Sequence, residues 1–314
     1  MFKETFDFYN STSLKSYNLD SVMKYQLSML ERLDAFTRRH SENVANLVCR
    51  VCEYLHCKKS FTIYATICAY LHDIGKMFIP PEIVAKPGKL TPEEYEIIKS
   101  HTTLGYKMCI KDLQLRPYSA GPLYHHEALN GTGYPNGLTK KDIPYVAQII
   151  RVADEYDAIV TKRQYTTHVN ISETLKDLIK DARPANYLKT VALDMLTENY
   201  KHGKINPKIL KALFKVVIDD TYYEISCVMQ YIDYLKEQVK RLETIQKYGE
   251  KMHNSTKEKD KKYYEEGMKI LFESGETIDN YEQVLSEYLD AIVKRQEVKK
   301  RLYDEIKIIK KLRI

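Results

Sequence analysis

Three short segments of the sequence combine residue types that bind metals and phosphate. Two adjacent histidines, His125 and His126, are followed by Glu127, and the pair His72-Asp73 lies upstream of them. Adjacent imidazoles and a histidine–aspartate pair are what a two-metal hydrolytic site requires. A glycine-rich segment, residues 131–135 (GTGYP), follows directly. Because such a turn lets the backbone approach a phosphate, these segments predict a metal-dependent phosphodiesterase.

The candidate metal ligands recur at regular intervals along the chain. Successive candidates are separated by 32, 1, 28, 24, 1 and 28 residues. A helix with its connection takes roughly 20 to 30 residues, so successive helices can each bring one or two ligands to a common centre. Imidazole nitrogens mixed with carboxylate oxygens suit iron, manganese or zinc, and a shared carboxylate can hold two ions close together. The candidates are His40, His72, Asp73, His101, His125, His126 and Asp154.

The elements that must position these ligands are predicted to be helices. Apolar residues recur at helical intervals in residues 31–55, and residues 61–71 are almost wholly apolar, which suits a buried helix ending at His72-Asp73 and stopped by Gly75. Thr91-Pro92-Glu93-Glu94 has the cap, the proline and the acids of a helix start, and that helix would carry His101. Strand-like alternation is hard to find, so we expect an all-α fold.

A change in composition near residue 207 indicates a domain boundary. All ten prolines lie at or before Pro207, whereas average usage of about 5% would put around five in the rest of the chain. Beyond it, apolar residues from Ile225 to Leu242 recur at spacings of 3 and 4, and an imperfect second seam runs from Leu285 to Ile309. The polar stretch 247–261 is predicted to be the turn, and Ser274-Gly275 a break. We expect an N-terminal segment (1–20), a catalytic domain (21–218) and a helical hairpin or coiled coil (219–314).

Charge and hydropathy exclude some partners. The net charge of +6 is concentrated in residues 294–314, which hold nine Lys or Arg and three Asp or Glu, and we interpret this as a solvated helix face rather than a nucleic-acid site. No stretch approaches the roughly 20 apolar residues that cross a bilayer, and residues 1–10 lack a basic and then apolar leader. The six cysteines are scattered. We therefore expect a cytoplasmic protein with reduced thiols and no integral membrane segment.

Four motifs, in order, resemble the HD-GYP domain, a subgroup of the HD phosphohydrolases that hydrolyses cyclic di-GMP. They are HDIGK (72–76), IPPEIVAKPGKLTPEEYEIIKSH (79–101), HHEALNGTGYPNGL (125–138) and VADEYDA (152–158), and the likeness runs from about Glu31 to about Lys215. The resemblance implies an all-α, HD-type helical bundle, to which residues 219–314 add a hairpin or coiled-coil extension. It also implies hydrolysis of cyclic di-GMP to linear pGpG, with a further step to GMP as an option.

The resemblance divides the candidate ligands between two divalent ions, with Asp73 as the bridge. Four protein ligands on each ion, a shared hydroxide and a substrate oxygen make about six, which favours iron or manganese, with zinc and magnesium as alternatives. The hydroxide, activated by both metals, would attack phosphorus in line. Phe36 stands where some members of the family have a glutamate for a third ion, so we predict a dinuclear site. One ion would be held by His40, His72, Asp73 and Asp154, and the other by Asp73, His101, His125 and His126.

The resemblance also assigns residues to the substrate. Lys76 matches a phosphate-facing lysine and is, with Asp73, a predicted catalytic residue; Arg163 matches a phosphate-binding arginine. Gly133, Tyr134 and Pro135 would form the signature loop at the mouth of the site. Three positions depart from the family pattern: Asn130 replaces a common aspartate, Gln164 a proline, and Thr166 a frequent Lys or Arg. The loss of that cation would weaken the grip on the diester or change which dinucleotide fits.

Two other functions fit the same residues. One is a cyclic-dinucleotide sensor without turnover, whose helical tail reports occupancy to a partner. The other is a hydrolase of another cyclic dinucleotide, such as cyclic GMP-AMP. In each case we expect a cyclic dinucleotide as the small-molecule partner, and a homodimer or a signalling partner as the binding partner of residues 219–314.

Overall fold

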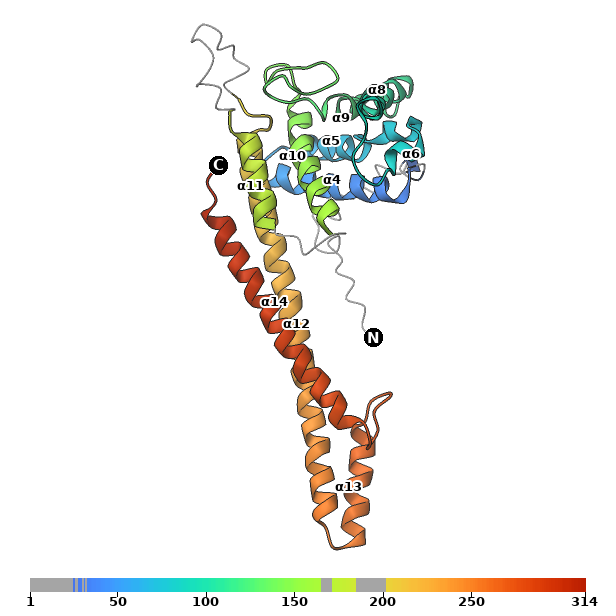
Figure 1. Cartoon of the computed structure of the whole chain (residues 1–314), viewed down its shortest axis with the longest axis vertical. Coiled ribbons are helices and arrows are strands. Elements are labelled where there is room, and N and C mark those ends of the chain that lie inside the picture. Colours follow the sequence, from blue (N-terminus) through green and yellow to red (C-terminus); the bar gives the residue numbers. More distant parts are fainter. Residues whose placement is uncertain (1–24, 26–27, 30, 32, 165–170, 185–201) are drawn as a thin grey trace. The chain divides into compact units, whose positions relative to one another are not determined.

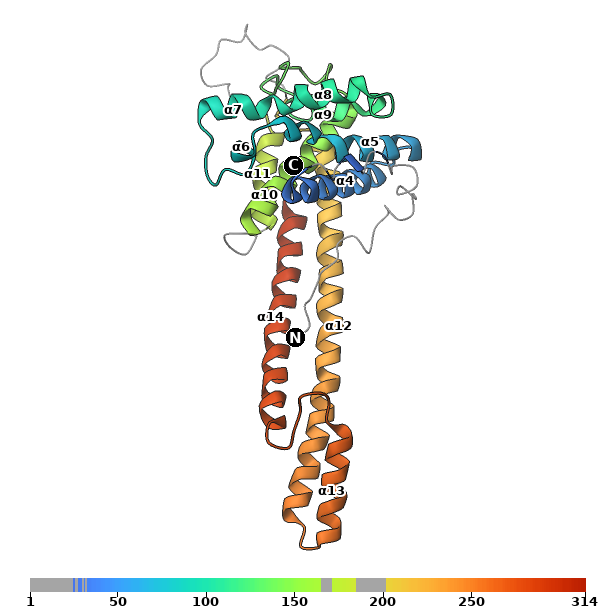
Figure 2. The same cartoon turned by 90° about the vertical axis from the view of Figure 1, so that its right-hand side faces the viewer.

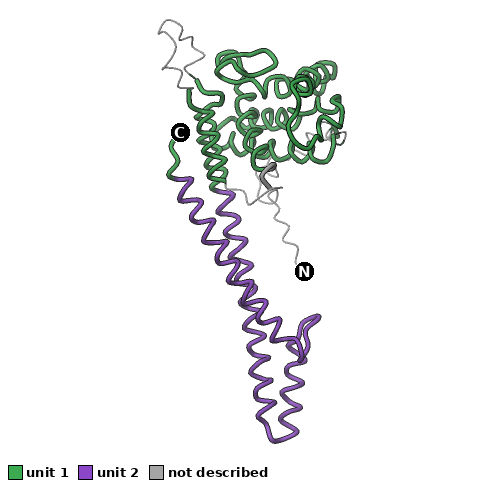
Figure 3. Tube along the Cα trace, viewed as in Figure 1, with its two compact units in different colours: residues 1–218, 311–314 green, residues 219–310 purple. Residues whose placement is uncertain are grey.

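Helices are the main regular structure in the part of the chain that the structure describes. This computed structural model describes residues 25, 28–29, 31, 33–164, 171–184 and 202–314 (Figure 1). Within these ranges there is no strand, and one isolated bridge pairs Asn130 with Thr139. The prediction of an all-α fold is therefore confirmed. Two compact units are formed, Met1–Ile218 with Lys311–Ile314, and Asp219–Lys310 (Figure 3).

The first unit is built around two long helices, α4 (Ala35–Tyr54) and α10 (Tyr145–Gln164). Helix α4 packs against α10 and against α5 (Lys59–Leu71), and these helices bury Val44, Val48, Ile67 and Ile149. The 3-10 segment η1 (Ile74–Phe78) and helix α9 (Ala120–Tyr124) both pack against α8 (His101–Lys111). The other elements of this unit are α6 (Pro81–Val84), α7 (Pro92–Lys99), η2 (Arg116–Tyr118), α11 (Ile171–Ala182) and the start of α12 (Pro207–Asn254).

Helix α4 begins later than the apolar spacing of residues 31–55 indicates. The carboxylate of Asp34 accepts hydrogen bonds from the backbone N–H groups of Phe36 (3.0 Å) and Thr37 (2.9 Å). This is the bonding of a helix N-cap, whose own backbone is extended, so the helical path starts after Asp34. Six residues into the helix, His40 lies on its buried side.

The link between α5 and α8 gives Gly75 a role other than the predicted helix stop. Helix α5 ends at Leu71, directly before the predicted end at His72-Asp73, so these two residues lie where the chain leaves the helix. Gly75 then lies inside η1, and a Cβ atom there would be 1.9 Å from the carbonyl oxygen of His101. Only the absence of a side chain allows this approach, and the approach brings His72 and Asp73 next to the start of α8.

The predicted helix start at Thr91 is confirmed, but the helix ends before His101. Thr91 and Glu94 form a capping box with Pro92 at the first position of α7. At the other end, the backbone N–H and the hydroxyl of Ser100 both donate to the carbonyl of Ile97 (3.1 and 2.6 Å). These bonds tighten the last turn and end α7 at Lys99. His101 is instead the first residue of α8.

The second unit contains the rest of α12, together with α13 (Glu258–Leu271) and most of α14 (Tyr281–Lys311). Lys310 donates a hydrogen bond to the hydroxyl of Tyr222 (2.9 Å), and the guanidinium of Arg295 lies 5.4 Å from the ring centroid of Tyr231. These contacts pair α12 with α14 in antiparallel fashion, and Figure 2 shows the two helices side by side. Gly275, at a positive φ of 89°, lies in the predicted break between α13 and α14.

The turn predicted at residues 247–261 is much shorter in the structure. Helix α12 continues to Asn254 and α13 begins at Glu258, so most of the polar stretch is helical. Tyr248 packs against a buried cluster and holds this part of α12 in place, because tertiary burial of one face stabilises a helix that polar composition alone would not. The cluster consists of Leu242, Ile245, Met268 and Tyr281.

Candidate metal centre

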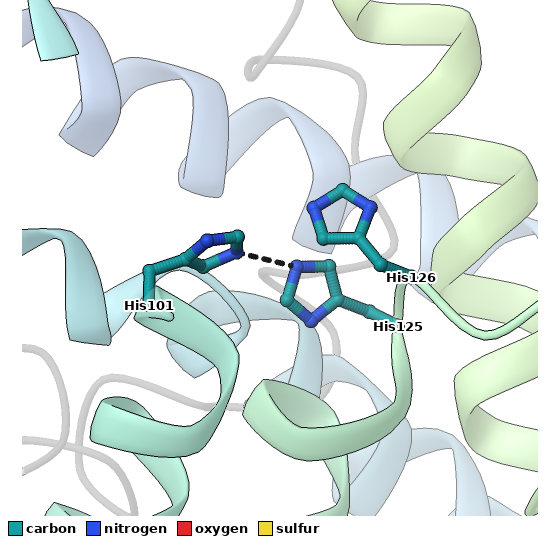
Figure 4. A group of neighbouring side chains, drawn as sticks. All are labelled: His101, His125 and His126. Carbon is teal, nitrogen blue, oxygen red and sulfur yellow. Dashed lines mark hydrogen bonds between the residues drawn. The ribbon is translucent and has the colours of Figure 1, made fainter. Parts of the chain in front are cut away.

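The first unit gathers the seven predicted ligands into one centre. His40 comes from α4, His72 and Asp73 follow α5, His101 opens α8, and Asp154 lies in α10. His125 and His126 follow α9, and Figure 4 shows both rings beside that of His101. Their ligand atoms form three groups within which all atoms lie within 4.8 Å of one another: His101, His125 and His126; His40, His72 and Asp73; His72, His125 and Asp154.

Asp73 lies between two sets of histidines. Its Oδ2 atom is 3.4 Å from Nε2 of His72 and 3.7 Å from Nε2 of His40. Its Oδ1 atom is 3.4 Å from Nε2 of His101 and 3.9 Å from Nε2 of His125. Each carboxylate oxygen therefore faces the histidines of one predicted ion, which is the arrangement that a bridging carboxylate needs. The third group crosses the predicted division, because it places His125 of one predicted ion beside His72 and Asp154 of the other.

Three of the histidines are oriented by the backbone. Nδ1 of His72 donates to the carbonyl of Ala69 (2.6 Å), and Nδ1 of His101 donates to that of Ile98 (2.5 Å). Nδ1 of His125 is shared between the carbonyls of Gly121 and Pro122, at 3.0 Å each. Because a neutral imidazole carries one proton, these bonds leave the Nε2 lone pair of each ring aimed at the centre.

His40 is oriented by a carboxylate instead. Its Nδ1 lies 2.6 Å from Oδ2 of Asp157, and its Nε2 lies 3.0 Å from Oδ1 of Asp154. Burial by itself lowers the pKa of a histidine, but the two carboxylates outweigh burial and raise the pKa of His40 to about 10. A metal ion taking Nε2 as its ligand therefore has to replace a firmly held proton.

The other titratable groups hold charges that suit a cation site. Burial opposes ionisation of Asp73, yet Lys76 and the surrounding histidines keep the pKa of Asp73 well below its usual range. Burial is the main reason why the pKa of His126 falls to about 3 and why that of His125 is also lowered. Asp73 is thus ionised beside the neutral imidazoles of His125 and His126, the protonation states in which these groups bind metals, whereas His40 has to lose a proton first.

One nitrogen of the candidate ligand set is buried without a hydrogen-bond partner among the described residues. Nε2 of His72 is fully buried and makes no hydrogen bond to any residue that the structure describes. A buried nitrogen lone pair without a partner costs free energy, and a metal ion satisfies it. The surrounding nitrogen and oxygen donors fit a divalent transition metal.

Lys76 lies at the edge of the centre. Its Nζ atom donates to Oδ2 of Asp73 at 2.6 Å, and about a quarter of its side chain (23%) is exposed. The ammonium therefore lies between the buried carboxylate and solvent, from which a phosphate would arrive. Its predicted role toward a phosphate stays a prediction.

The signature loop is held against the centre by Glu127. The buried carboxylate of Glu127 accepts hydrogen bonds from the backbone N–H groups of Asn136 (2.7 Å) and Leu138 (2.8 Å). A Cβ on Gly133 would lie 2.2 Å from the backbone nitrogen of Ala128, so glycine is required for the loop to fold back. The ring of Tyr134, the residue before Pro135, then stacks on that of His126 with centroids 4.7 Å apart.

Helix α10 fixes the start of the same loop. Arg151 donates through Nη1 to the carbonyls of His126 (2.7 Å) and Glu127 (3.1 Å), and through Nη2 to Glu155 (2.5 Å). Since Asp154 is on the same helix, α10 positions this candidate ligand together with the backbone of the candidate ligand His126.

The remaining positions considered in the sequence lie outside this cluster of ligands or outside the described residues. Arg163 and Gln164 lie in the last turn of α10, where the described structure includes no side chains, and Thr166 lies outside the described residues. Phe36, the position considered for a third ion, has 53% of its surface exposed. The side-chain oxygen of Asn130 accepts from the backbone N–H (3.2 Å) and the hydroxyl (2.7 Å) of Thr132, so it serves the turn.

Sequence reasoning assigned no role to Asp157, Glu127 or Arg151. Asp157 and Arg151 each lie three residues from Asp154, and residues at that spacing share a helix face. This spacing was a usable signal. Glu127 gave no comparable signal, because its partners Asn136 and Leu138 are brought to it only by the fold of the loop.

The remaining findings concern membranes and thiols. None of the helices in the described ranges combines the length and the apolar run that a bilayer crossing requires. All six cysteines are free, and burial raises the pKa of Cys49 and Cys109 to about 12, as expected of thiols used for packing.

Comparison with known proteins identifies the first unit. A family model described as HD domain matches residues 24–191, more than half of the chain. The family prediction drawn from the motifs is thus confirmed, and so is the prediction of an HD-type helical fold.

Curated relatives align with part of the chain. A protein of Thermotoga maritima named cyclic di-GMP phosphodiesterase is 41% identical over 157 residues, which cover 48% of this chain and 42% of that protein. The cyclic di-GMP phosphodiesterase response regulator RpfG of Xanthomonas campestris is 36% identical over 139 residues (43% of this chain, 36% of that protein). The 3'3'-cGAMP-specific phosphodiesterase 1 of Vibrio cholerae is 29% identical over 191 residues (58% and 42%). The aligned part spans less than half the length of each relative.

Proposed function

The chain belongs to the HD domain family, and on that premise we propose that it is a metal-dependent phosphodiesterase that hydrolyses cyclic di-GMP to linear pGpG, with further cleavage to GMP as an option. The proposal rests on the position of Asp73, whose two carboxylate oxygens face two different sets of histidine Nε2 atoms. The names of two relatives, at 41% and 36% identity, favour cyclic di-GMP as the substrate.

Two divalent ions, iron or manganese in preference to zinc or magnesium, would supply Lewis acidity that activates a water molecule and neutralises charge on the phosphate. We propose that Asp73 bridges them. His40, His72 and Asp154 complete the donors on one side of Asp73, and His101, His125 and His126 complete those on the other.

The chain's own residues prepare the site for a phosphodiester. The backbone carbonyls that accept from Nδ1 of His72, His101 and His125 lock these rings before any ligand arrives, which removes an ordering cost from binding. Lys76 holds an ammonium beside Asp73 and is partly exposed, so an entering phosphate oxygen meets a positive charge at the edge of the centre. Glu127 and Gly133 keep Tyr134 stacked on His126 at the edge of the centre.

The proposal is tested by assaying the full-length protein for cyclic di-GMP cleavage under reducing conditions with Fe²⁺ or Mn²⁺. We expect pGpG as the product, and we expect His72→Ala or Asp73→Ala to reduce turnover by more than about 10³-fold, because each removes a ligand. His253→Ala is the matched control, since His253 lies on the exposed face of α12 in the second unit. Absence of turnover with both metals would sink the proposal.

A second substrate is favoured by one observation. The Vibrio cholerae relative named 3'3'-cGAMP-specific phosphodiesterase 1 aligns over a longer stretch, 191 residues, although at lower identity. A competition assay with equal concentrations of cyclic di-GMP and 3'3'-cyclic GMP-AMP distinguishes the two. Preferential loss of cyclic GMP-AMP would replace the substrate in the proposal and keep the reaction.

A further inference from the structure

A lysine lies over the ring of the tyrosine that stacks on one of the candidate metal ligands. The Nζ atom of Lys99 is 5.7 Å from the ring centroid of Tyr134 and 5.3 Å from that of Tyr95. Tyr134 in turn stacks on His126 with an interplanar angle of 27°. A series of contacts therefore leads from the candidate metal ligand His126 toward solvent. It is formed by Tyr134, Lys99 and Tyr95, which we call the aromatic row.

Two separate elements build the aromatic row. Tyr95 and Lys99 are four residues apart on α7 and so share one face of that helix. Tyr134 is on the signature loop, which Glu127 holds by two backbone hydrogen bonds. Together the two elements bring the ammonium of Lys99 over the ring that stacks on His126.

The aromatic row is open to a ligand. Tyr95 has 48% of its surface exposed, and the side chain of Lys99 has 26% exposed. Lys99 forms an ion pair with Glu96 at 2.6 Å, but Glu96 is 70% exposed. Exposed pairs of this kind contribute little, so an anionic ligand can take the place of Glu96. The two tyrosine rings keep the ammonium close to them through cation–π attraction.

We propose that Lys99 is a specificity-determining residue that binds the second phosphodiester of a cyclic dinucleotide while the first lies at the metal centre. A cyclic dinucleotide closes two phosphodiesters into one ring, so a ligand anchored at His126 carries its other negative charge a short distance away, toward the aromatic row. The exposed ring of Tyr95 adds a surface on which a nucleobase can stack. This inference rests on the proposed function and adds to it a reason for preferring cyclic dinucleotides over simple diesters.

The test compares two substrates in the metal-loaded, full-length protein. Cyclic di-GMP has the second phosphodiester, and bis(p-nitrophenyl) phosphate has a single one. For Lys99→Met we expect the KM for cyclic di-GMP to rise about tenfold, because a hydrogen bond to a charged group is lost. We expect kcat, metal content and cleavage of bis(p-nitrophenyl) phosphate to match wild type. Lys99→Arg should keep the wild-type KM, and Lys107→Met on α8, which removes an exposed lysine outside the aromatic row, is the charge-matched control.

Other results overturn the inference in distinguishable ways. If Lys99→Met lowers metal content and slows both substrates alike, the lysine only supports the loop. An unchanged KM for cyclic di-GMP, with the wild type active, refutes the role of Lys99 and leaves the proposed function standing. A wild-type protein that cleaves bis(p-nitrophenyl) phosphate but no cyclic dinucleotide defeats both.

Discussion

The candidate histidine ligands differ in what holds their rings. His72, His101 and His125 donate to backbone carbonyls of the preceding turn, which are neutral and fixed by the helix. His40 alone among these four has a carboxylate, Asp157, on its Nδ1 atom. A carboxylate behind an imidazole both fixes the ring and raises its basicity as a ligand. Asp157 is therefore the residue outside the ligand set that we expect to influence metal binding most.

Replacing Asp157 tests this role. We expect Asp157→Ala to weaken the binding of one ion by about 10- to 100-fold, as is usual when the partner of a metal-bound histidine is removed. Asp157→Asn should lose less, because the amide oxygen can still accept from Nδ1. The measurement is a titration of the metal-free protein with Mn²⁺ against a competing chelator.

Asp142→Ala is the matched control for Asp157→Ala. Asp142 lies at the surface, where its carboxylate accepts a hydrogen bond from Thr139 at 3.0 Å. Wild-type affinity in both alanine variants would contradict the assigned role of Asp157.

At the scale of elements, the approach of η1 to α8 decides whether His101 reaches Asp73. The absence of a side chain at Gly75 allows this approach, because a Cβ atom there would lie 1.9 Å from the carbonyl oxygen of His101 and 2.6 Å from the backbone nitrogen of Gly105. Backbone atoms cannot rotate away as a side chain can. The two elements would therefore have to separate to accept any side chain at this position.

Gly75→Ala is expected to lower the free energy of unfolding by about 1–3 kcal/mol, the usual cost of overpacking. It should also reduce the bound metal, since His101 moves away from Asp73. Denaturant unfolding and metal analysis measure the two effects. Gly249→Ala, in the interior of α12, is the control: its nearest contact is a side-chain hydroxyl at 3.3 Å, and we expect a change of less than ~1 kcal/mol. Wild-type stability and metal content in Gly75→Ala would rule out this account.

Local signals located the ends of some elements and not of others. The capping box at Thr91 was readable because its bonds join residues three apart. The end of α7 before His101 was not readable, since Ser100 and Ile97 are ordinary helix residues in the sequence. The continuation of α12 to Asn254 depends on Tyr248 packing on residues from α13 and α14, which are distant in sequence.

At the scale of the whole molecule, each unit has its own core. The second unit buries Leu242 and Ile245 against Met268 and Tyr281. Arg241 also forms a two-pronged ion pair with Glu276, with Nη1 and Nη2 at 2.5 and 2.6 Å from the carboxylate oxygens. The metal centre uses none of these residues. The role of residues 219–314 toward a dimer or signalling partner stays a prediction.

We expect Leu242→Ala to destabilise the second unit by about 2–5 kcal/mol, because it leaves a cavity in a packed cluster. Bound metal should stay at the wild-type level, since all seven candidate ligands are in the first unit. Thermal unfolding followed together with metal analysis checks both. Leu289→Ala is the control, because Leu289 is 46% exposed and its loss should change stability by less than about 0.5 kcal/mol. Loss of metal in Leu242→Ala would show that the two units do not behave independently.

The sequence by itself determined the helical class and the seven candidate ligands, because helical periodicity and donor type are properties of short segments and of single residues. The tertiary structure alone decided three further features. The first is the position of Asp73, whose two carboxylate oxygens face different histidines. The others are the carboxylate of Asp157 on Nδ1 of His40, and the hydrogen bonds by which Glu127 holds the loop that places Tyr134 over His126. Each joins atoms from segments that helix packing brings together, and periodicity within one segment carries no information about how it packs on another.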